Sequence, residues 1–202
     1  MTEKIVIVDY GMGNLHSVQK AFQSIGAEVE VTSSVQKIAL ADRLVLPGVG
    51  AFGDCMKNLR AYGLDEVICE FMQNGRPFLG ICLGLQLLFE ESEESPGCRG
   101  LGVFKGKVRL IETTQKIPHM GWNNIELRAA SPLWTKETGY YYFVHSYQAE
   151  PKDKKIITAV CDYGTEVTAA IGYQNVQAVQ FHPEKSGKNG LALLAAFKEW
   201  QL

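Results

Sequence analysis

The segment Phe78-Leu79-Gly80-Ile81-Cys82-Leu83-Gly84-Leu85-Gln86 decides how this chain is expected to fold. Its apolar run over 78–81 predicts a buried strand, and residues 84–90 predict the helix that follows it. Glycines stand two positions before and two positions after Cys82, the spacing of a sharp strand-to-helix turn that exposes a nucleophile. The positive end of that helix would favour a thiolate, and the Leu83 amide would point toward a developing oxyanion. We therefore expect Cys82 to be a nucleophile.

Two similar strand and loop units precede this segment. Each has an apolar run followed by a glycine-bearing loop, and the pairs are 5–8 with 9–14 and 44–46 with 47–50. Apolar residues at helical spacing predict helices around 15–25 and 64–71, and Ser33 and Gln36 have the spacing of a capping box. Continuous apolar strands separated by amphipathic helices are typical of a parallel sheet covered on both faces. Ligands of such sheets bind beyond the carboxyl ends of the strands, where all three loops lie.

The second half of the chain has strand patterns with few helices between them. The predicted strands span 107–111, 140–147, 156–160, 167–172 and 176–181. Tyr173-Gln174-Asn175 predicts a hairpin turn between the last two, and apolar residues over 191–197 predict a closing helix. The sequence has no internal repeat and no low-complexity linker. We predict a single domain over 1–202 with an α/β, flavodoxin-like, three-layer fold, in which helices cover both faces of a mixed central sheet.

A cysteine nucleophile needs a base, and the base needs a group that orients it. Four histidines are available, at positions 16, 119, 145 and 182. In Phe181-His182-Pro183-Glu184 the proline bend would let the Glu184 carboxylate reach back to the imidazole. Such a carboxylate fixes the tautomer and stabilises the imidazolium, as the third member of a catalytic triad does. We predict a triad of Cys82, His182 and Glu184, and we regard His145 as a weaker candidate because no carboxylate closely follows it.

The composition argues against several classes of partner. The chain has 202 residues, 46% of them hydrophobic, and its 20 basic and 22 acidic side chains give a net charge of −2. No basic excess exists to neutralise a phosphate backbone, so we expect no nucleic-acid partner. No apolar run approaches the roughly 20 residues of a membrane helix, and the start of the chain lacks the apolar core of a signal peptide. We therefore expect a soluble, cytoplasmic protein with no membrane partner.

Metal and cofactor sites are not expected either. The five cysteines are an odd number without a CxxC pair, which indicates reduced thiols in a reducing compartment. His119 and His145 lack ligand spacing with any cysteine or carboxylate pair. The Gly11-x-Gly13 loop lacks the third glycine of a dinucleotide-binding fingerprint. We predict an enzyme that uses neither a metal nor a cofactor.

At these motifs the sequence resembles the class I, triad-type glutamine amidotransferases. Residues 80–86 are similar to the nucleophile motif of that family, and 181–184 are similar to its closing motif. Further segments resemble the glutaminase subunits of imidazole glycerol phosphate synthases within the family, and these are 9–14, 47–52, 118–123 and 182–186. Most other class I members carry two glycines after the proline of the second loop, whereas this chain has Val49 at the second position. The resemblance covers the whole chain and implies a free-standing subunit with the class I glutamine amidotransferase fold.

The resemblance also implies a reaction, a partner and residue roles. Glutamine would be hydrolysed through a thioester on Cys82, and the ammonia would pass within a heterodimer to a separate, barrel-shaped cyclase subunit. The cyclase would make imidazole glycerol phosphate and an aminoimidazole carboxamide ribonucleotide in histidine biosynthesis. The implied positions are Val49 and Leu83 for the oxyanion, Gly50, Gln86, Ser146 and Tyr147 around glutamine, and Asn14, Trp122, Tyr140 and Lys185 at the cyclase interface. A core position for Trp122 is the alternative.

Three other functions stay open from the sequence. A glutaminase subunit of another pathway, such as anthranilate or pyridoxal phosphate synthesis, is disfavoured by Val49 and by segment 118–123. A stand-alone cysteine hydrolase on a similar sheet would use the same turn at Cys82 and would work without a partner. A non-catalytic binding module is disfavoured because all three triad residues are present.

Overall fold

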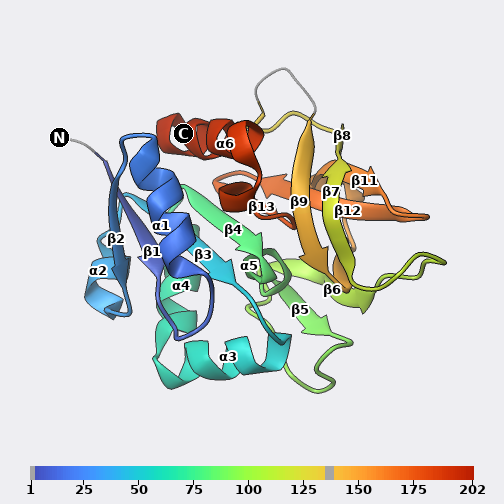
Figure 1. Cartoon of the computed structure of the whole chain (residues 1–202). Helices are drawn as coiled ribbons and strands as arrows, with labels where there is room; N and C mark the ends of the chain where they lie inside the picture. The colour runs from blue at the N-terminus through green and yellow to red at the C-terminus, as the bar shows by residue number, and fades with distance from the viewer. Residues whose placement is uncertain (1–2, 135–138) are drawn as a thin grey trace.

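The computed structural model describes residues 3–134 and 139–202, which form a layered α/β fold (Figure 1). These residues contain an eight-stranded central sheet, in which the first five strands in spatial order run parallel and the last three pair antiparallel. The strands in spatial order are β2 (Glu28–Thr32), β1 (Lys4–Val8), β3 (Arg43–Gly48), β4 (Phe78–Cys82), β13 (Val176–Val179), β12 (Glu166–Tyr173), β11 (Ile157–Asp162) and β8 (Glu126–Leu127). The predicted mixed sheet is confirmed.

Helices cover both faces of this sheet, as predicted (Figure 1). On one face lie α1 (Leu15–Ser24) and α6 (Gly187–Glu199), and on the other lie α2 (Val35–Ala39), α3 (Phe52–Ala61) and α4 (Leu64–Gln73). Alternate strand residues point to opposite faces, so each strand serves both layers. In β1, Val6 and Val8 pack toward α3 and α4. Ile5 and Ile7 pack toward α1 and α6.

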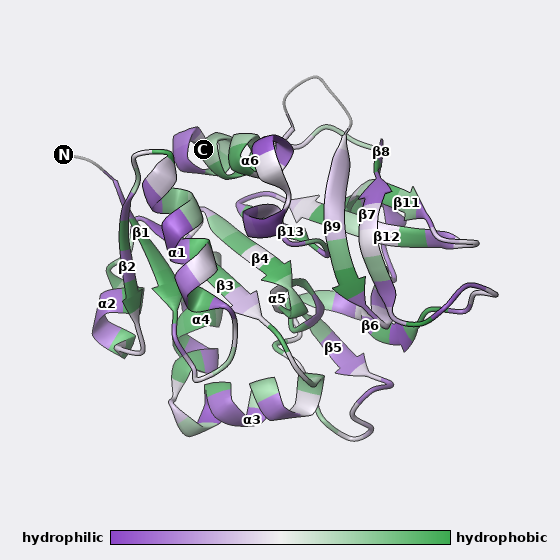
Figure 2. Ribbon diagram, in the orientation of Figure 1, coloured by the Kyte–Doolittle hydropathy of each residue, from purple (hydrophilic) through white to green (hydrophobic). Residues whose placement is uncertain are grey.

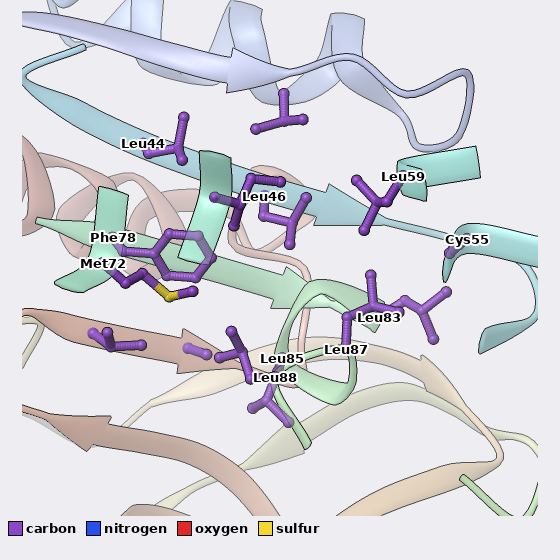
Figure 3. Packing of buried hydrophobic residues seen from close by; sticks show 14 of the residues in the cluster. Leu44, Leu46, Cys55, Leu59, Met72, Phe78, Leu83, Leu85, Leu87 and Leu88 are labelled. Atoms are coloured by element: carbon purple, nitrogen blue, oxygen red, sulfur yellow. The ribbon is translucent and has the colours of Figure 1, made fainter. Parts of the chain in front are cut away.

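The central strands are buried on both faces, which explains their continuous apolar sequences. Figure 2 shows β1 and β4 as hydrophobic over most of their length, whereas α1 and α3 alternate between hydrophobic and hydrophilic residues. On the α3 and α4 side, Phe78 of β4 lies beside Met72 of α4, and Leu46 of β3 lies in the same cluster (Figure 3). All three side chains are at most 5% exposed. The strand ends that carry the predicted site therefore emerge from a rigid core.

Two smaller sheets lie beside the central one. They consist of β5 (Phe89–Ser92), β6 (Phe104–Leu110) and β10 (Tyr147–Pro151), and of β7 (His119–Asn124) with β9 (Tyr140–His145). The strand predicted over 140–147 is thus two strands, because the chain changes pairing partner at Ser146. There the Ser146 carbonyl accepts a hydrogen bond from the Ile111 amide at 3.0 Å. A short 3₁₀ helix, η1 (Lys154–Ile156), precedes β11.

The prediction of a helix over 84–90 was wrong about the length of the helix. The helix α5 (Leu83–Gln86) has only four residues, and Phe89 already begins β5. The side chains of Leu87, Leu88 and Phe89 are all completely buried, so the segment has no polar face to expose as a helix would. Its carbonyls pair with the next segment instead, because Leu87 accepts from the Leu101 amide at 2.8 Å.

Two further helix details differ from the sequence predictions. The helix α3 was not predicted, although Phe52, Cys55, Met56 and Leu59 have helical spacing and are buried. The cap of α2 is Ser34 rather than Ser33, because the Ser34 hydroxyl accepts a hydrogen bond from a backbone amide in the first turn.

The predicted hairpin between β12 and β13 is confirmed, and so is the predicted closing helix, α6. In the described residues, no helix is long and apolar enough to cross a membrane.

Candidate active site

Cys82 lies at the sharp turn between β4 and α5. Its backbone has φ of 54° and ψ of −108°, a conformation that residues other than glycine rarely adopt unless the surrounding structure enforces it. A side-chain carbon at Gly84 would lie 1.9 Å from the Leu46 carbonyl oxygen, and one at Gly80 would lie 2.8 Å from the Gly84 carbonyl oxygen. Only glycine at both positions lets α5 approach β3 and β4 this closely. The flanking glycines are therefore a packing requirement of the turn.

The shortness of α5 changes one part of the sequence prediction. A helix over 84–90 was expected to favour a thiolate through its dipole, but a single turn of four residues has few aligned peptide groups. The amides of Leu83 and Gly84 open this turn, where backbone N–H groups have no partner within the helix. Local donors to the sulfur and to an oxyanion thus matter more than a helix dipole.

Strand pairing brings His182 to the nucleophile although a hundred positions separate them. β13 lies beside β4 in parallel register, with Val179 opposite Ile81. The chain therefore leaves both strands at the same edge of the sheet, where Cys82 ends β4 and Gln180 and His182 follow β13. The loops after β1 and β3 end at this edge as well, as the sequence predicted.

The imidazole of His182 is oriented by Glu184. Its Nδ1 lies 2.8 Å from Glu184 Oε1, and a carboxylate only accepts, so Nδ1 carries the proton. Pro183 begins the 3₁₀ turn η2 (Pro183–Lys185), which brings the carboxylate back toward the ring. The side chains of His182 and Glu184 are 3% and 1% exposed. Nε2 is consequently the nitrogen left to interact with Cys82.

Burial and neighbouring charges compete to set the charge of His182. Burial lowers the pKa of the imidazole, but its interactions with the Cys82 sulfur and the Glu184 carboxylate outweigh this and raise it to about 10. Nε2 is buried and has no well-formed hydrogen bond to any described residue. The Cys82 sulfur is therefore near enough to raise the pKa of the ring, but it is not aligned for a good hydrogen bond. The raised pKa of His182 makes its Nε2 a strong acceptor for the proton of a nearby thiol, which is how a base activates a cysteine nucleophile.

Most of the predicted site residues meet in one cleft of about 300 Å³. Those that line it are Val49, Gly50, Cys82, Leu83, Gln86, Ser146, Tyr147, His182 and Lys185. Glu184 lies behind His182 and does not line the cleft. A larger cavity of about 560 Å³ is lined by residues that include Cys69 and Phe104, but none of the described residues around it is a histidine. The smaller cleft is the candidate active site because it holds the nucleophile and the base.

Gln86 is part of the cleft wall rather than a solvated helix residue. Its side-chain amide donates to the Tyr147 carbonyl at 3.0 Å and to Gln180 Oε1 at 3.0 Å. Gln180 Nε2 in turn lies 3.7 Å from Cys82 Sγ, within hydrogen-bonding distance for sulfur. The sequence reasoning missed Gln180. The available signal was a glutamine near the end of the mostly apolar run 176–181, directly before the histidine motif.

His119 and His145 form a buried histidine pair beside the cleft. Nδ1 of His119 lies 3.0 Å from Nε2 of His145, and Nδ1 of His145 lies 2.8 Å from the Tyr147 carbonyl oxygen. Burial lowers the pKa of His119 to about 4 and that of His145 to about 3, so both rings are neutral at pH 7. Both nitrogens of His145 are engaged, which removes it as a base for Cys82.

The residues that the resemblance assigns to a partner lie at the surface. Trp122 and Tyr140 are 56% and 61% exposed, which excludes a core position for Trp122. Asn14 and Lys185 are exposed as well. Of these residues only Lys185 lines the cleft. No group of described histidine, cysteine, aspartate and glutamate residues is arranged to hold a metal ion.

Comparison with known proteins places the chain in a family. The profile of the family described as glutamine amidotransferase class-I matches residues 6–199. The protein named imidazole glycerol phosphate synthase subunit HisH from Methanothermobacter thermautotrophicus is 52% identical to this chain, over 96% of this chain and 98% of its own length. The protein of the same name from Aquifex aeolicus is 50% identical, over 96% of each chain. The solved structure of PurLQS from Thermotoga maritima has a similar fold, with a TM-score of 0.77 at 19% identity over 98% of each chain. The chain belongs to the class-I glutamine amidotransferase family.

Proposed function

We propose that this chain is the glutaminase subunit of an imidazole glycerol phosphate synthase and that it hydrolyses glutamine to glutamate and ammonia. Two relatives that carry the name of this synthase subunit match nearly the whole chain at 52% and 50% identity. The observation that carries the proposed chemistry is the strained turn that holds Cys82 in one cleft with His182, which Glu184 orients.

The reaction would proceed in two halves through a thioester. His182 Nε2 takes the thiol proton of Cys82, and the sulfur attacks the side-chain amide carbon of glutamine. The same imidazole then protonates the leaving ammonia as the tetrahedral intermediate collapses. Water attacks the thioester while His182 removes a proton from it, and the sulfur departs to leave glutamate. Glu184 keeps Nδ1 protonated and stabilises the imidazolium in both halves.

We assign the developing oxyanion to the backbone amides of Leu83 and Val49. Two hydrogen bonds hold the chain around Val49. The Tyr10 hydroxyl donates to the Pro47 carbonyl near the end of β3 at 2.9 Å, and the Cys55 thiol donates to the Val49 carbonyl at 3.5 Å. Loss of one oxyanion donor typically costs about 10²- to 10³-fold in rate. A misoriented amide in this loop would therefore keep the isolated chain nearly inactive until its partner is bound.

Glutamine would lie in the cleft against Gly50, Gln86, Ser146 and Tyr147. The Gln86 amide nitrogen donates to two protein acceptors, which leaves its oxygen available to accept from a bound ligand. Gly50 has φ of +94°, and a side-chain carbon there would lie 2.9 Å from the methyl group of Met12. Its glycine backbone can therefore approach a ligand closely.

The surface beside the cleft supports a protein partner of the cyclase type. Met120 and Trp122 of β7 and Tyr140 of β9 are large side chains that are each more than half exposed. Large exposed apolar and aromatic groups that adjoin one another are typical of protein interfaces. Together with Asn14 and Lys185, they would face the subunit that consumes the ammonia.

We also infer the domain organisation of the chain and the kind of compartment in which it works. The two apolar clusters lie on opposite faces of one sheet, which supports the single domain over 1–202, of which residues 1–2 and 135–138 lie outside the described residues. All five cysteines are free thiols, which supports a reducing compartment such as the cytoplasm.

The test is glutamate release by this chain alone, with a cyclase subunit, and with the cyclase and its nucleotide ligand. We expect strong stimulation by the liganded partner and loss of release in every condition after Cys82→Ala. Equal turnover by the isolated chain would favour a stand-alone hydrolase instead. Release that persists in Cys82→Ala would refute the assigned nucleophile.

A further inference from the structure

Gln180 is a fully buried polar side chain in contact with the proposed nucleophile. It follows the last residue of β13, and its backbone amide donates to the Ala169 carbonyl at 2.8 Å, which fixes it to β12. Parallel register with β4 places it beside Cys82, and its Nε2 lies 3.7 Å from Cys82 Sγ. None of the roles described so far uses this side chain.

The direction of the Gln180 amide is fixed by its neighbours. The Tyr147 carbonyl can only accept, so the group of Gln86 that faces it is the NH₂ group. The same NH₂ group faces Gln180, so the Gln180 atom opposite it must be the carbonyl oxygen, at 3.0 Å. The Gln180 NH₂ group is consequently the one that faces Cys82 Sγ.

The donors and acceptors on the other side of the Tyr147 carbonyl, in the histidine pair, can be assigned in the same way. His145 Nδ1 must donate to that carbonyl, so its Nε2 accepts from Nδ1 of His119. His119 Nε2 therefore accepts from the Asn123 side-chain amide, at 3.2 Å. Asn123 also donates to a backbone carbonyl, that of Asp162, at 2.8 Å, which identifies its NH₂ end. One assignment of hydrogens satisfies every contact from Asn123 to the sulfur.

We propose that Gln180 is a donor to the reacting sulfur, oriented by Gln86, and that it stabilises the thiolate of Cys82 and holds it toward His182. The inference rests on the proposed role of Cys82 as the nucleophile. A donor aimed at sulfur favours the thiolate because hydrogen bonds to a charged acceptor are stronger than those to a neutral one. Gln180 thereby supplies locally what the four-residue helix α5 supplies only weakly.

Other titratable groups also face Cys82 and are unchanged by a substitution at Gln180. His182 reaches it from the turn after β13, and Tyr10 and Cys55 interact with it from the loop after β1 and from α3. Glu94, His145, Tyr147 and Lys185 line the same cleft. These seven groups stay in place when Gln180 changes, so a difference between variants at Gln180 reports the donor itself.

The experiment measures alkylation of Cys82 by iodoacetamide as a function of pH. Mass spectrometry of the peptide that contains Cys82 separates this sulfur from the other four cysteines. Gln180→Met removes the donor at similar length, and Gln180→Glu keeps an acceptor for Gln86 but turns a carboxylate oxygen toward the sulfur. At neutral pH we expect about tenfold slower alkylation in Gln180→Met, with the midpoint of the pH curve about one unit higher. The shift in Gln180→Glu should be larger, and wild type and Gln180→Met should reach the same plateau at high pH.

Gln177→Glu is the matched control. Gln177 lies on β13, three residues before Gln180, is 3% exposed and accepts from the Ser131 hydroxyl at 2.8 Å, so its substitution likewise buries a carboxylate close by in the chain. Its alkylation curve should match that of wild type. Superimposable curves for wild type and Gln180→Met would overturn the proposal. A loss in Gln180→Met that is equal at every pH, plateau included, would indicate a structural role and would overturn it as well.

Glutaminase kinetics of the complex with the cyclase separate this inference from the proposed function. Gln180→Met should lower kcat about tenfold at neutral pH and leave KM for glutamine nearly unchanged, because the side chain contacts the sulfur rather than the cleft. If Cys82→Ala keeps its activity, the proposed function fails. If Cys82→Ala is inactive while Gln180→Met has the kcat and alkylation curve of wild type, only the role of Gln180 fails.

Discussion

Substitution of Gly84 by alanine tests whether the turn at Cys82 depends on close approach of the backbone. The new side-chain carbon would lie 1.9 Å from the Leu46 carbonyl oxygen, so α5 and β3 must separate by about 1 Å or more. The obstacle is strand backbone at the centre of the sheet, which cannot rotate away as a flexible side chain would. Overpacking costs about 1–3 kcal/mol or more, and this position belongs at the upper end, at about 3–4 kcal/mol. For a domain of this size the thermal midpoint should fall by roughly 6–16 °C.

Thermal unfolding followed by circular dichroism measures this effect, and Gly75→Ala is the control. Gly75 follows α4 and has φ of +75°, and a side-chain carbon at this position would have nothing within 4 Å, so the change should cost only about 1 kcal/mol, from backbone strain alone. Gly84→Ala should also slow alkylation of Cys82, because the turn that carries the sulfur must move. Equal melting of the two variants, with unchanged alkylation, would refute the reasoning.

Three further predictions concern the site and its surroundings. Glu184→Gln should lower glutamate release by the complex about 10³-fold, since an amide no longer enforces the tautomer of His182, and an unchanged kcat would contradict the triad. The histidine pair should destabilise the fold in acid: burial holds their pKa values at about 4 and about 3, so the unfolded chain binds more protons below about pH 6.5, and the urea midpoint should fall between pH 7 and pH 5. A flat urea midpoint would count against this. Tyr10→Phe removes the hydroxyl that anchors the Pro47 carbonyl and should lower kcat severalfold with little change in KM, whereas a raised KM alone would place its effect on binding.

Most of the order of strands and helices over 5–82 was predictable because its signals are local, although α3 was missed. Continuous apolar runs and helical spacing need no knowledge of distant residues, and β1, α1, β3 and β4 lie where they were expected. The segments from residue 87 onward resisted prediction for a physical reason. Whether 87–92 forms a helix or a strand depends on its pairing with 101–108, and whether 140–147 is one strand or two depends on which sheet each half joins. Such tertiary pairings override local propensity.

In the candidate site, too, residues marked by a local pattern were predictable and residues placed by strand pairing were not. Cys82 and its flanking glycines could be predicted because their spacing already encodes the turn. Gln180 could not, because a glutamine in an apolar strand gives no hint of which neighbour it will meet. Only the parallel register of β13 with β4 places it beside the sulfur. The histidine pair was likewise invisible, since His119 and His145 meet only through the pairing of β7 with β9.

The parts of this site differ in how firmly the fold holds them, and that difference suggests where control is exerted. Cys82 and His182 leave neighbouring strands of one rigid sheet and are buried, so their separation is set by strand register. Val49 lies in the loop between β3 and α3, and its side chain is 38% exposed. A partner that reorients this loop can raise kcat without rebuilding the triad. Alkylation needs the sulfur but no oxyanion donor, so a partner acting in this way would stimulate glutamine hydrolysis and leave the alkylation of Cys82 unchanged.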